Sequence, residues 1–137
     1  MAKFVALDYD IELGGTDFTK SIAAVTLDIS AAEQEVTAFG DSFVQRISGL
    51  KDASVSIDFH QDFGAGAIDE ILFPLIGQTL EIKVRPNSGA ISATNPSYEG
   101  TFLVTEYSPF ASSIGDLATF SVSFPLASGD IVRNTGA

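Results

Sequence analysis

The sequence predicts a mainly β protein: a β-sandwich of about seven to eight strands with one short flanking α-helix and a long projecting hairpin or loop arm. Three observations favour this fold. Most of the chain alternates between apolar and polar residues, which is typical of half-buried strands. Residues 65–76 change instead to helical spacing. Residues 30–50 form a connection that is too long and too apolar for an ordinary loop of a compact domain.

The alternating segments form a series of short strands. Their apolar positions, such as Val55, Ile57 and Phe59, are expected to face the core, and the positions between them to face water. The expected strands are residues 4–13, 21–29, 51–60, 79–85, 98–107, 118–124 and a short terminal strand at 131–133. At 137 residues, the chain is expected to form a single domain over residues 1–137.

The helix is expected from apolar residues at helical spacing, namely Ile68, Ile71, Leu72 and Leu75. Asp69 and Glu70 lie near its N-terminal end, where the helix dipole favours acids. Pro74 removes a backbone donor, so the helix is expected to end or kink there, with Gly77 beyond its last residue.

The arm, residues 30–50, carries six large apolar side chains: Val36, Phe39, Phe43, Val44, Ile47 and Leu50. Disorder fits badly, because disordered connections are poor in aromatic and β-branched residues. Gly40 and Asp41 predict a two-residue type II′ turn between extended residues 36–39 and 42–44. We expect a projecting hairpin that docks on a neighbouring subunit through these side chains, although its composition equally allows an ordinary hairpin folded back on the same domain.

Composition argues against several functional classes. Eighteen acids against seven bases give a net charge of −11, and the chain has no cysteine. A disulfide or thiolate metal site is therefore impossible, and the clustered bases that bind nucleic-acid phosphates are missing. Lys83 with Arg85, and Arg46 near Lys51, lie among acids and are interpreted as solvated faces. The N-terminal residues lack the apolar core of a secretory signal, and residues 71–76 are too few to span a bilayer, so we expect a soluble protein without a membrane segment.

Catalytic chemistry has little support in the sequence. His60 is the only histidine, and Asp58 and Asp62 beside it make a hydrolytic triad conceivable. No nucleophile motif accompanies these residues, and His60 lies at a polar position of its strand. A solvated surface histidine is the favoured interpretation, and no catalytic residue is predicted.

Metal and cofactor sites are not predicted either. Asp8, Asp10 and Glu12 are similar to the opening of a calcium loop, but Leu13 stands where that loop requires glycine. The glycines at 64 and 66 lack the third glycine of a dinucleotide-binding loop, since Asp69 stands in its place. They are better explained by a tight turn before the helix. We therefore expect no cofactor.

Several segments in fixed order carry a resemblance to a known family. They are YDIELGGTDFTKSI, VTAFGD followed by ISGLKDASVSIDFHQDF, the short helix, NPSYEG after a loop, and GDLATFSVSFPLASGDIVR at the end. Over nearly its whole length, the chain resembles the tail tube (major tail) proteins of long-tailed, non-contractile bacteriophages. This resemblance implies a β-sandwich with a flanking helix, of which six copies form a ring whose inner sheets join into one β-barrel. It also implies that a long loop and the termini grip neighbouring rings.

The resemblance implies a structural virion protein and no enzyme. Hexameric rings would stack into a tail tube, an acidic conduit through which double-stranded DNA passes without specific binding. The implied partners are the protein itself, a tape-measure protein during assembly, and tail tip and terminator proteins; the implied location is the virion tail, with the host cytoplasm during assembly. Two alternatives remain open: an inner tube subunit of a contractile tail or related injection machine, and a monomeric β-sandwich ligand-binding module.

Two strands present outward residues suited to the lining of such a tube. The candidates are small, uncharged or acidic: Ser54, Ser56 and Asp58 on one strand, and Thr119, Ser121 and Ser123 on the other. They lack long basic side chains that would hold passing phosphates. The face with Lys83 and Arg85 is a poor lining for DNA, and we expect it on the outside or at a subunit interface.

Overall fold

The computed structural model describes residues 7–136 and confirms the mainly β fold. Its single sheet is entirely antiparallel. The described elements, in chain order, are β1 (Asp10–Leu13), β2 (Thr16–Asp17), the 3-10 helix η1 (Thr19–Ser21), β3 (Ile22–Glu35), β4 (Arg46–His60), α1 (Ile68–Leu75), β5 (Thr79–Arg85), β6 (Ser97–Leu103) and β7 (Thr119–Asn134).

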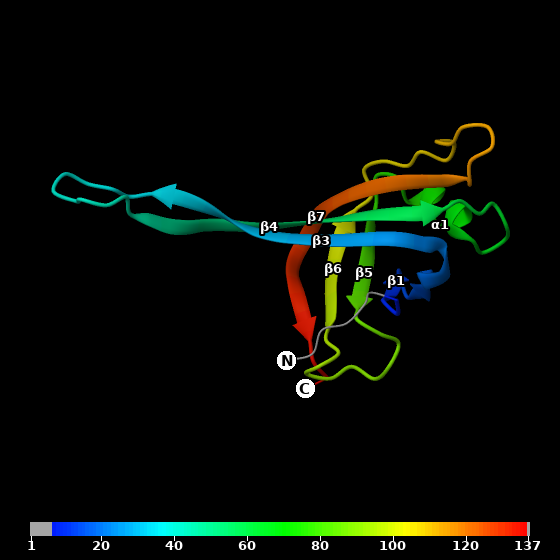
Figure 1. Cartoon of the computed structure of the whole chain (residues 1–137), viewed down its shortest axis with the longest axis horizontal. Helices are drawn as coiled ribbons and strands as arrows, with labels where there is room; N and C mark the ends of the chain where they lie inside the picture. Colours follow the sequence, from blue (N-terminus) through cyan, green and yellow to red (C-terminus); the bar gives the residue numbers. More distant parts are fainter. Residues whose placement is uncertain (1–6, 137) are drawn as a thin grey trace.

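The sheet has the strand order β2-β1-β5-β6-β7-β4-β3 and folds over into two layers (Figure 1). Residues 119–125 of β7 pair with β4, and residues 126–134 pair with β6. β7 therefore belongs to both layers. We call β3, β4 and the first part of β7 the inner layer; the outer layer consists of β2, β1, β5, β6 and the second part of β7.

The continuity of β7 corrects one expectation. Two separate strands, 118–124 and 131–133, were expected, and this prediction is wrong because the residues between them also pair with β6, at Leu126 and Ser128. Register shifts in this pairing and the positive φ of 70° at Gly129 let the strand bend without leaving the ladder.

The core lies between the two layers and contains the apolar residues that alternation predicts. Phe59 of β4 stacks on Phe120 of β7 with 5.0 Å between the ring centroids, and Tyr107 meets Phe120 edge-on at 5.1 Å. The buried cluster is Ile11, Leu13, Phe18, Val55, Ile57, Phe59, Ile68, Leu72, Leu80, Ile82, Phe102, Val104, Phe120, Val122 and Phe124.

The helix α1 is shorter than the expected 65–76. Gly66 has a φ of 72°, which is incompatible with a helix, so α1 begins only at Ile68. Pro74 lies in its last turn, and Gly77 follows with a φ of 85°. Tyr107 Oη donates a 2.5 Å hydrogen bond to Asp69, which ties the start of the helix to the loop that follows β6.

Three further boundaries differ from expectation. The strand expected over residues 4–13 begins at Asp10, and residues 4–6 of that prediction lie outside the described part. Residues 16–20, which lie between the expected strands 4–13 and 21–29, contain β2 and the start of η1. β6 ends at Leu103 because the next residues turn towards β7: the Thr105 hydroxyl donates to the Ser123 carbonyl (3.4 Å), and Glu106 accepts from the Ser123 N–H (2.9 Å).

Candidate functional site

The arm is a continuation of β3 and β4 beyond the body. The expected strands 21–29 and 51–60 are both too short, because the ladder continues outward to the pair Glu35 and Arg46. A bulge between Ala31 and Glu33 interrupts this ladder at the root of the arm. The result is a two-stranded ribbon that projects from the body along the long axis of the molecule (Figure 1). This ribbon is the projecting hairpin that the sequence predicts.

The tip of the arm, residues 36–45, corrects the predicted turn. The Asp41 N–H bonds the Ala38 carbonyl at 3.1 Å, so Gly40, with a φ of 97°, is the third residue of the turn and not the second. Type II′ needs its glycine at the second position, so that prediction is wrong. The expected extended residues 36–39 and 42–44 are loop; the Val36 N–H still reaches the Gln45 carbonyl (2.8 Å), and the Asp41 carboxylate accepts from the Ala38 N–H (2.9 Å).

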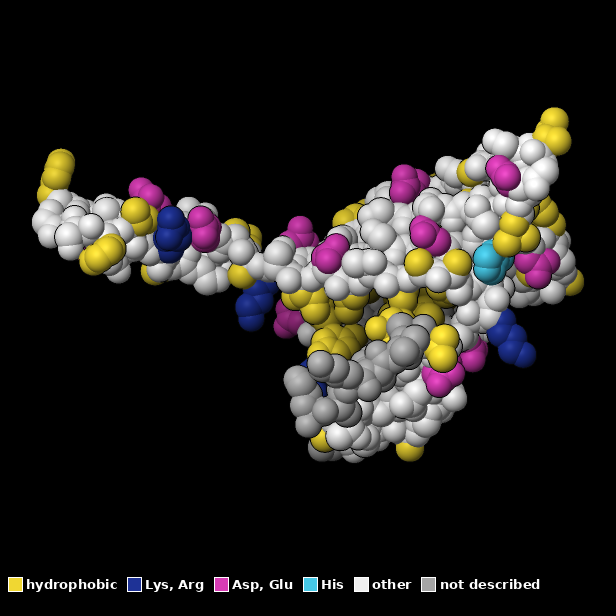
Figure 2. Space-filling model, in the orientation of Figure 1, with side chains coloured by type: hydrophobic (Ala, Val, Ile, Leu, Met, Phe, Trp, Pro, Cys, Tyr) yellow, Lys and Arg dark blue, Asp and Glu magenta, His cyan; other side chains and the backbone are white. Residues whose placement is uncertain are grey.

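All six apolar side chains of the arm are exposed. Their relative exposures are Val36 46%, Phe39 109%, Phe43 80%, Val44 50%, Ile47 57% and Leu50 89%. Figure 2 shows hydrophobic side chains standing out along the arm. Apolar side chains gathered in this way on a projecting ribbon indicate a surface that a partner covers.

The lining candidates lie together on the outward face of the inner layer. Ser56 is opposite Ser123, and Asp58 is opposite Ser121, whose hydroxyl donates to the Asp58 carboxylate at 2.6 Å. The Ser56 and Ser123 hydroxyls are 3.4 Å apart. Ser54 and Thr119 continue the same two rows. The six residues therefore share one surface, exposed or half-buried throughout.

Sequence reasoning missed a third row on this face, which β3 supplies. Ala24, Thr26 and Asp28 lie opposite Asp58, Ser56 and Ser54, respectively. These three residues alternate with the half-buried Val25 and Leu27, and this alternation could have identified the row from the sequence. The three rows present Asp28 and Asp58 and no lysine or arginine, so this face is small, polar and acidic.

The β3 edge of the inner layer is open to a further strand, and the β7 edge is open in part. Within residues 7–136, β3 pairs with β4 alone, and residues 119–125 of β7 also pair with β4 alone. Open edges are templates for pairing with another chain. At the β7 edge, side chains of Thr105 and Glu106 occupy the backbone groups of Ser123, and the Ser112 hydroxyl occupies those of Thr119, so a strand that pairs there must displace these side chains.

The basic residues of β5 lie on the outer layer, away from the lining candidates. Arg85 is not simply solvated as expected: its Nη2 lies 2.6 Å from the carboxylate of Asp10, whose side chain is 6% exposed. Lys83 pairs with Glu81 at 3.5 Å. Sequence reasoning missed the Arg85–Asp10 ion pair, because 75 residues separate its members.

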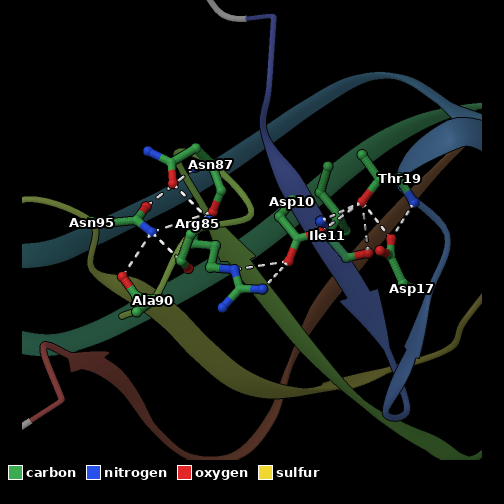
Figure 3. A network of polar contacts seen from close by, with 9 residues as sticks. Asp10, Ile11, Asp17, Thr19, Arg85, Asn87, Ala90 and Asn95 are labelled. Carbon is green, nitrogen blue, oxygen red and sulfur yellow. Dashed lines mark hydrogen bonds and ion pairs between the residues drawn. The ribbon is translucent and has the colours of Figure 1, made fainter. Parts of the chain in front are cut away.

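A polar network surrounds this ion pair (Figure 3). The Thr19 hydroxyl donates a hydrogen bond to the Asp10 carboxylate. The hydroxyl and the backbone N–H of Thr19 also donate to the Asp17 carboxylate, and these bonds lower the pKa of Asp17. The side-chain amide of Asn95 donates to carbonyls of the 87–90 turn. No buried side-chain nitrogen or oxygen of this network lacks a partner, so its evident role is to hold the outer layer together.

His60 has no catalytic arrangement around it. The residue is half-buried rather than a freely solvated surface histidine, and its Nδ1 has no hydrogen-bond partner among the described residues. A triad needs a carboxylate at that nitrogen. Across residues 7–136, no group of three or more His, Cys, Asp or Glu side chains is placed to hold a metal ion. None of the helices described there is long and apolar enough to cross a membrane.

No protein-family model and no curated protein matches the chain. Solved structures with its fold include two from gene transfer agent particles. A chain of the virion of a native gene transfer agent (GTA) particle matches with a TM-score of 0.76 and 19% identity, over 96% of this chain and 99% of that one. A chain of the tail of an empty GTA particle with C6 symmetry matches with a TM-score of 0.69 and 19% identity, over 94% and 96%. The chain thus has the fold of a tail component of a phage-like particle, and its resemblance to tail tube proteins holds at the level of the fold.

Proposed function

We propose that the protein is a structural subunit of a phage-like tail tube and is not an enzyme. Six copies form a ring, and the rings stack into a tube that conducts DNA. The observation that carries this proposal is the match over 94% of the chain to a component of a tail with C6 symmetry. The whole chain, residues 1–137, is then one tail-tube-like domain.

Ring closure would use the two edges of the inner layer. If β3 of one copy pairs with residues 119–125 of β7 in the next, the inner layers of six copies join into one closed barrel. Closure pairs the edge backbone groups of every copy, and it requires that the strand displace the side chains of Thr105, Glu106 and Ser112 from the β7 edge.

The outward face of the inner layer then lines the bore. Its residues, Ser54, Ser56, Asp58, Thr119, Ser121 and Ser123, are small or acidic, as a passage for DNA requires. Six copies with a charge of −11 each give a ring of −66, and a lining of the same sign as the phosphates keeps DNA hydrated and unattached.

The arm supplies a contact between subunits. Its six side chains, Val36, Phe39, Phe43, Val44, Ile47 and Leu50, contribute binding free energy only when a neighbour buries them. A tape-measure protein and tail tip or terminator proteins are the further partners of a complete tail, and the tail of the virion is the location that follows.

Electron microscopy of the purified protein tests the proposal. Rings or long tubes of uniform bore are the expected result, and isolated globules at all concentrations would favour the monomeric binding module instead. A sheath that copurifies with tubes from infected or induced cells would favour the contractile alternative.

The arm is tested by replacing Phe39 and Phe43 together with serine. The double variant is expected to stay folded and soluble but to lose assembly, because both aromatic side chains of the arm are gone. Val132→Ser is the matched control: it also removes an exposed apolar side chain, 53% exposed, but from the body. Unchanged tube yield in the double variant would mean that the arm is an internal hairpin and makes no contact that assembly requires.

The bore is tested by adding lysines at Ser56 and Ser121. Particles are expected to assemble, since both sites lie on an outward face, but to deliver DNA slowly, and the defect should ease at high salt. Lysines at Ser88 and Ala93, on the exposed 86–96 loop, add the same charge elsewhere and should have no effect. Normal delivery by the Ser56 and Ser121 variant at low salt would mean that this face lies outside the bore.

A further inference from the structure

A second exposed apolar surface lies at the end of the body opposite the arm. We call it the distal cluster, and its members and relative exposures are Phe63 55%, Phe110 85%, Ile114 107% and Leu117 69%. Phe63 follows β4, and the other three belong to the loop between β6 and β7. Figure 1 places this loop and the arm at opposite ends of the long axis, and Figure 2 shows hydrophobic side chains on the outside of that end.

The distal cluster is held in place by contacts with the end of β4. The rings of Phe63 and Phe110 stack with 5.5 Å between their centroids. The Gln61 side chain donates to the Pro109 carbonyl at 2.9 Å, and its backbone N–H donates to the Ala118 carbonyl at 2.9 Å. The loop is thus fixed at both of its ends, so its exposed side chains are held in place before any partner binds.

The surroundings of the distal cluster are acidic. Residues 61–78 and 105–118 contain no lysine or arginine, and their acids are Asp62, Asp69, Glu70, Glu106 and Asp116. Two distal clusters facing one another would bring these carboxylates together, which opposes self-pairing. The outer part of the arm carries the acids Glu33, Glu35 and Asp41 beside its apolar side chains, and its one base, Arg46, pairs with the exposed Glu33 at 3.4 Å.

The arm and the distal cluster lie at opposite ends of one strand, since β4 runs from Arg46 in the arm to His60 beside the cluster. A contact between them joins different surfaces of two copies and leaves one of each free, so it repeats without closing. From residue 30 to residue 40 the arm spans about 30 Å, which lets it cross the boundary to a copy further along this axis.

We propose that the distal cluster is the seat for the arm of a copy in the adjacent ring. One contact then covers both exposed apolar surfaces. This inference rests on the proposed function, because it assumes that copies stack as rings; it names the receptor for the arm, which edge pairing within a ring does not provide.

Cross-linking tests the seat directly, because the chain has no cysteine of its own. Ser42→Cys places a thiol between the arm phenylalanines, and Ser113→Cys places one beside Ile114; both sites are exposed, and all apolar residues remain. Assembled protein carrying both substitutions is treated with a short bismaleimide. We expect a ladder of dimers, trimers and longer chains on a denaturing gel, since each copy contributes one arm and one seat.

The controls separate the possible contacts. Each single cysteine should give no ladder, and Ser42→Cys combined with Ser88→Cys, on the exposed 86–96 loop, should give none either. Dimers from Ser42→Cys alone would mean that arms pair with arms and would overturn the seat. Tubes without a ladder from the Ser42 and Ser113 pair would also overturn it, while leaving the proposed function intact.

A second measurement separates stacking from ring formation. Ile114→Ser with Leu117→Ser removes exposed apolar groups of the seat and is expected to raise the protein concentration needed for tubes by on the order of tenfold, with single rings still visible in electron micrographs. An unchanged threshold for tubes would overturn the seat. Absence of both rings and tubes in the unsubstituted protein would overturn the proposed function and the seat together.

Discussion

The arm and the body share two strands but differ in what supports them. Along β4, the residues Ala53, Val55, Ile57 and Phe59 are buried between the layers, whereas none of the residues 46–52 is buried. The backbone ladder with β3 nevertheless runs through both regions. Hydrogen bonding therefore continues where the core ends, while burial of side chains does not.

This difference shows what each region needs to be stable. A two-stranded ribbon without a packed face is marginal by itself, whereas the body has a core on one side of each layer. Under the proposed function, the arm obtains from a neighbouring copy the burial that the body obtains internally. Matched substitutions in the two regions test this contrast, and we order them from the largest expected effect to the smallest.

The largest contrast is between two phenylalanines. Phe59→Ala leaves a cavity beside Phe120 in the core and should lower the free energy of unfolding by about 3–5 kcal/mol. Phe39→Ala, at a fully exposed site of the arm, should change it by less than about 0.5 kcal/mol. Urea unfolding below the concentration of assembly measures both. Similar losses for the two variants would show that the arm packs on its own body.

The next contrast is between two ion pairs. Arg85→Met leaves the buried carboxylate of Asp10 without its cation and should cost about 3 kcal/mol of stability. Arg46→Met breaks the exposed pair with Glu33 on the arm and should cost less than about 1 kcal/mol. The same urea titrations compare them. Equal costs would contradict the view that the outer layer depends on the Asp10 network.

Two glycines give a smaller contrast. A Cβ at Gly100 would lie 2.6 Å from Ile131 Cδ1 in the body, so Gly100→Ala should destabilise the fold by about 1–3 kcal/mol. At Gly40, a Cβ meets nothing within 4 Å, and the only cost is the positive φ of 97°. Gly40→Ala should leave the unfolding midpoint almost unchanged while altering amide exchange at the tip. A large shift of that midpoint would mean that the turn supports the whole fold.

The smallest effect concerns pH and one body residue. Burial, together with the hydrogen bond to Asp69, raises the pKa of Tyr107 to about 12. A raised pKa means that the folded state holds the proton more tightly, so this stabilisation is complete below about pH 10, the ordinary tyrosine pKa, and is lost between there and about 12. Tyr107→Phe should flatten the decline of stability over that range. An identical decline in this variant and in the unsubstituted protein would assign the alkaline loss to other groups.

Local patterns were enough to predict much of this molecule. Alternation located the buried faces of β4, β5 and β7, since neighbouring residues of a strand point to opposite sides whatever lies beyond them. The helix was found from its period, but its start was placed too early because the positive φ of Gly66 leaves no periodic signal. The exposed aromatics of the arm were likewise recognisable, because nothing near them in the sequence could cover them.

Other features depend on how distant segments meet. β7 is one strand because β6 pairs with the residues between its two predicted parts, and Arg85 is held because Asp10 lies on the adjacent strand β1. The distal cluster exists because the end of β4 and the 108–118 loop come together. The sequence by itself determined which residues are extended and which faces are apolar, since both follow from spacing along the chain. Only the tertiary structure decided which of those faces are buried and which remain open for a neighbour, because burial depends on the order in which the strands pair.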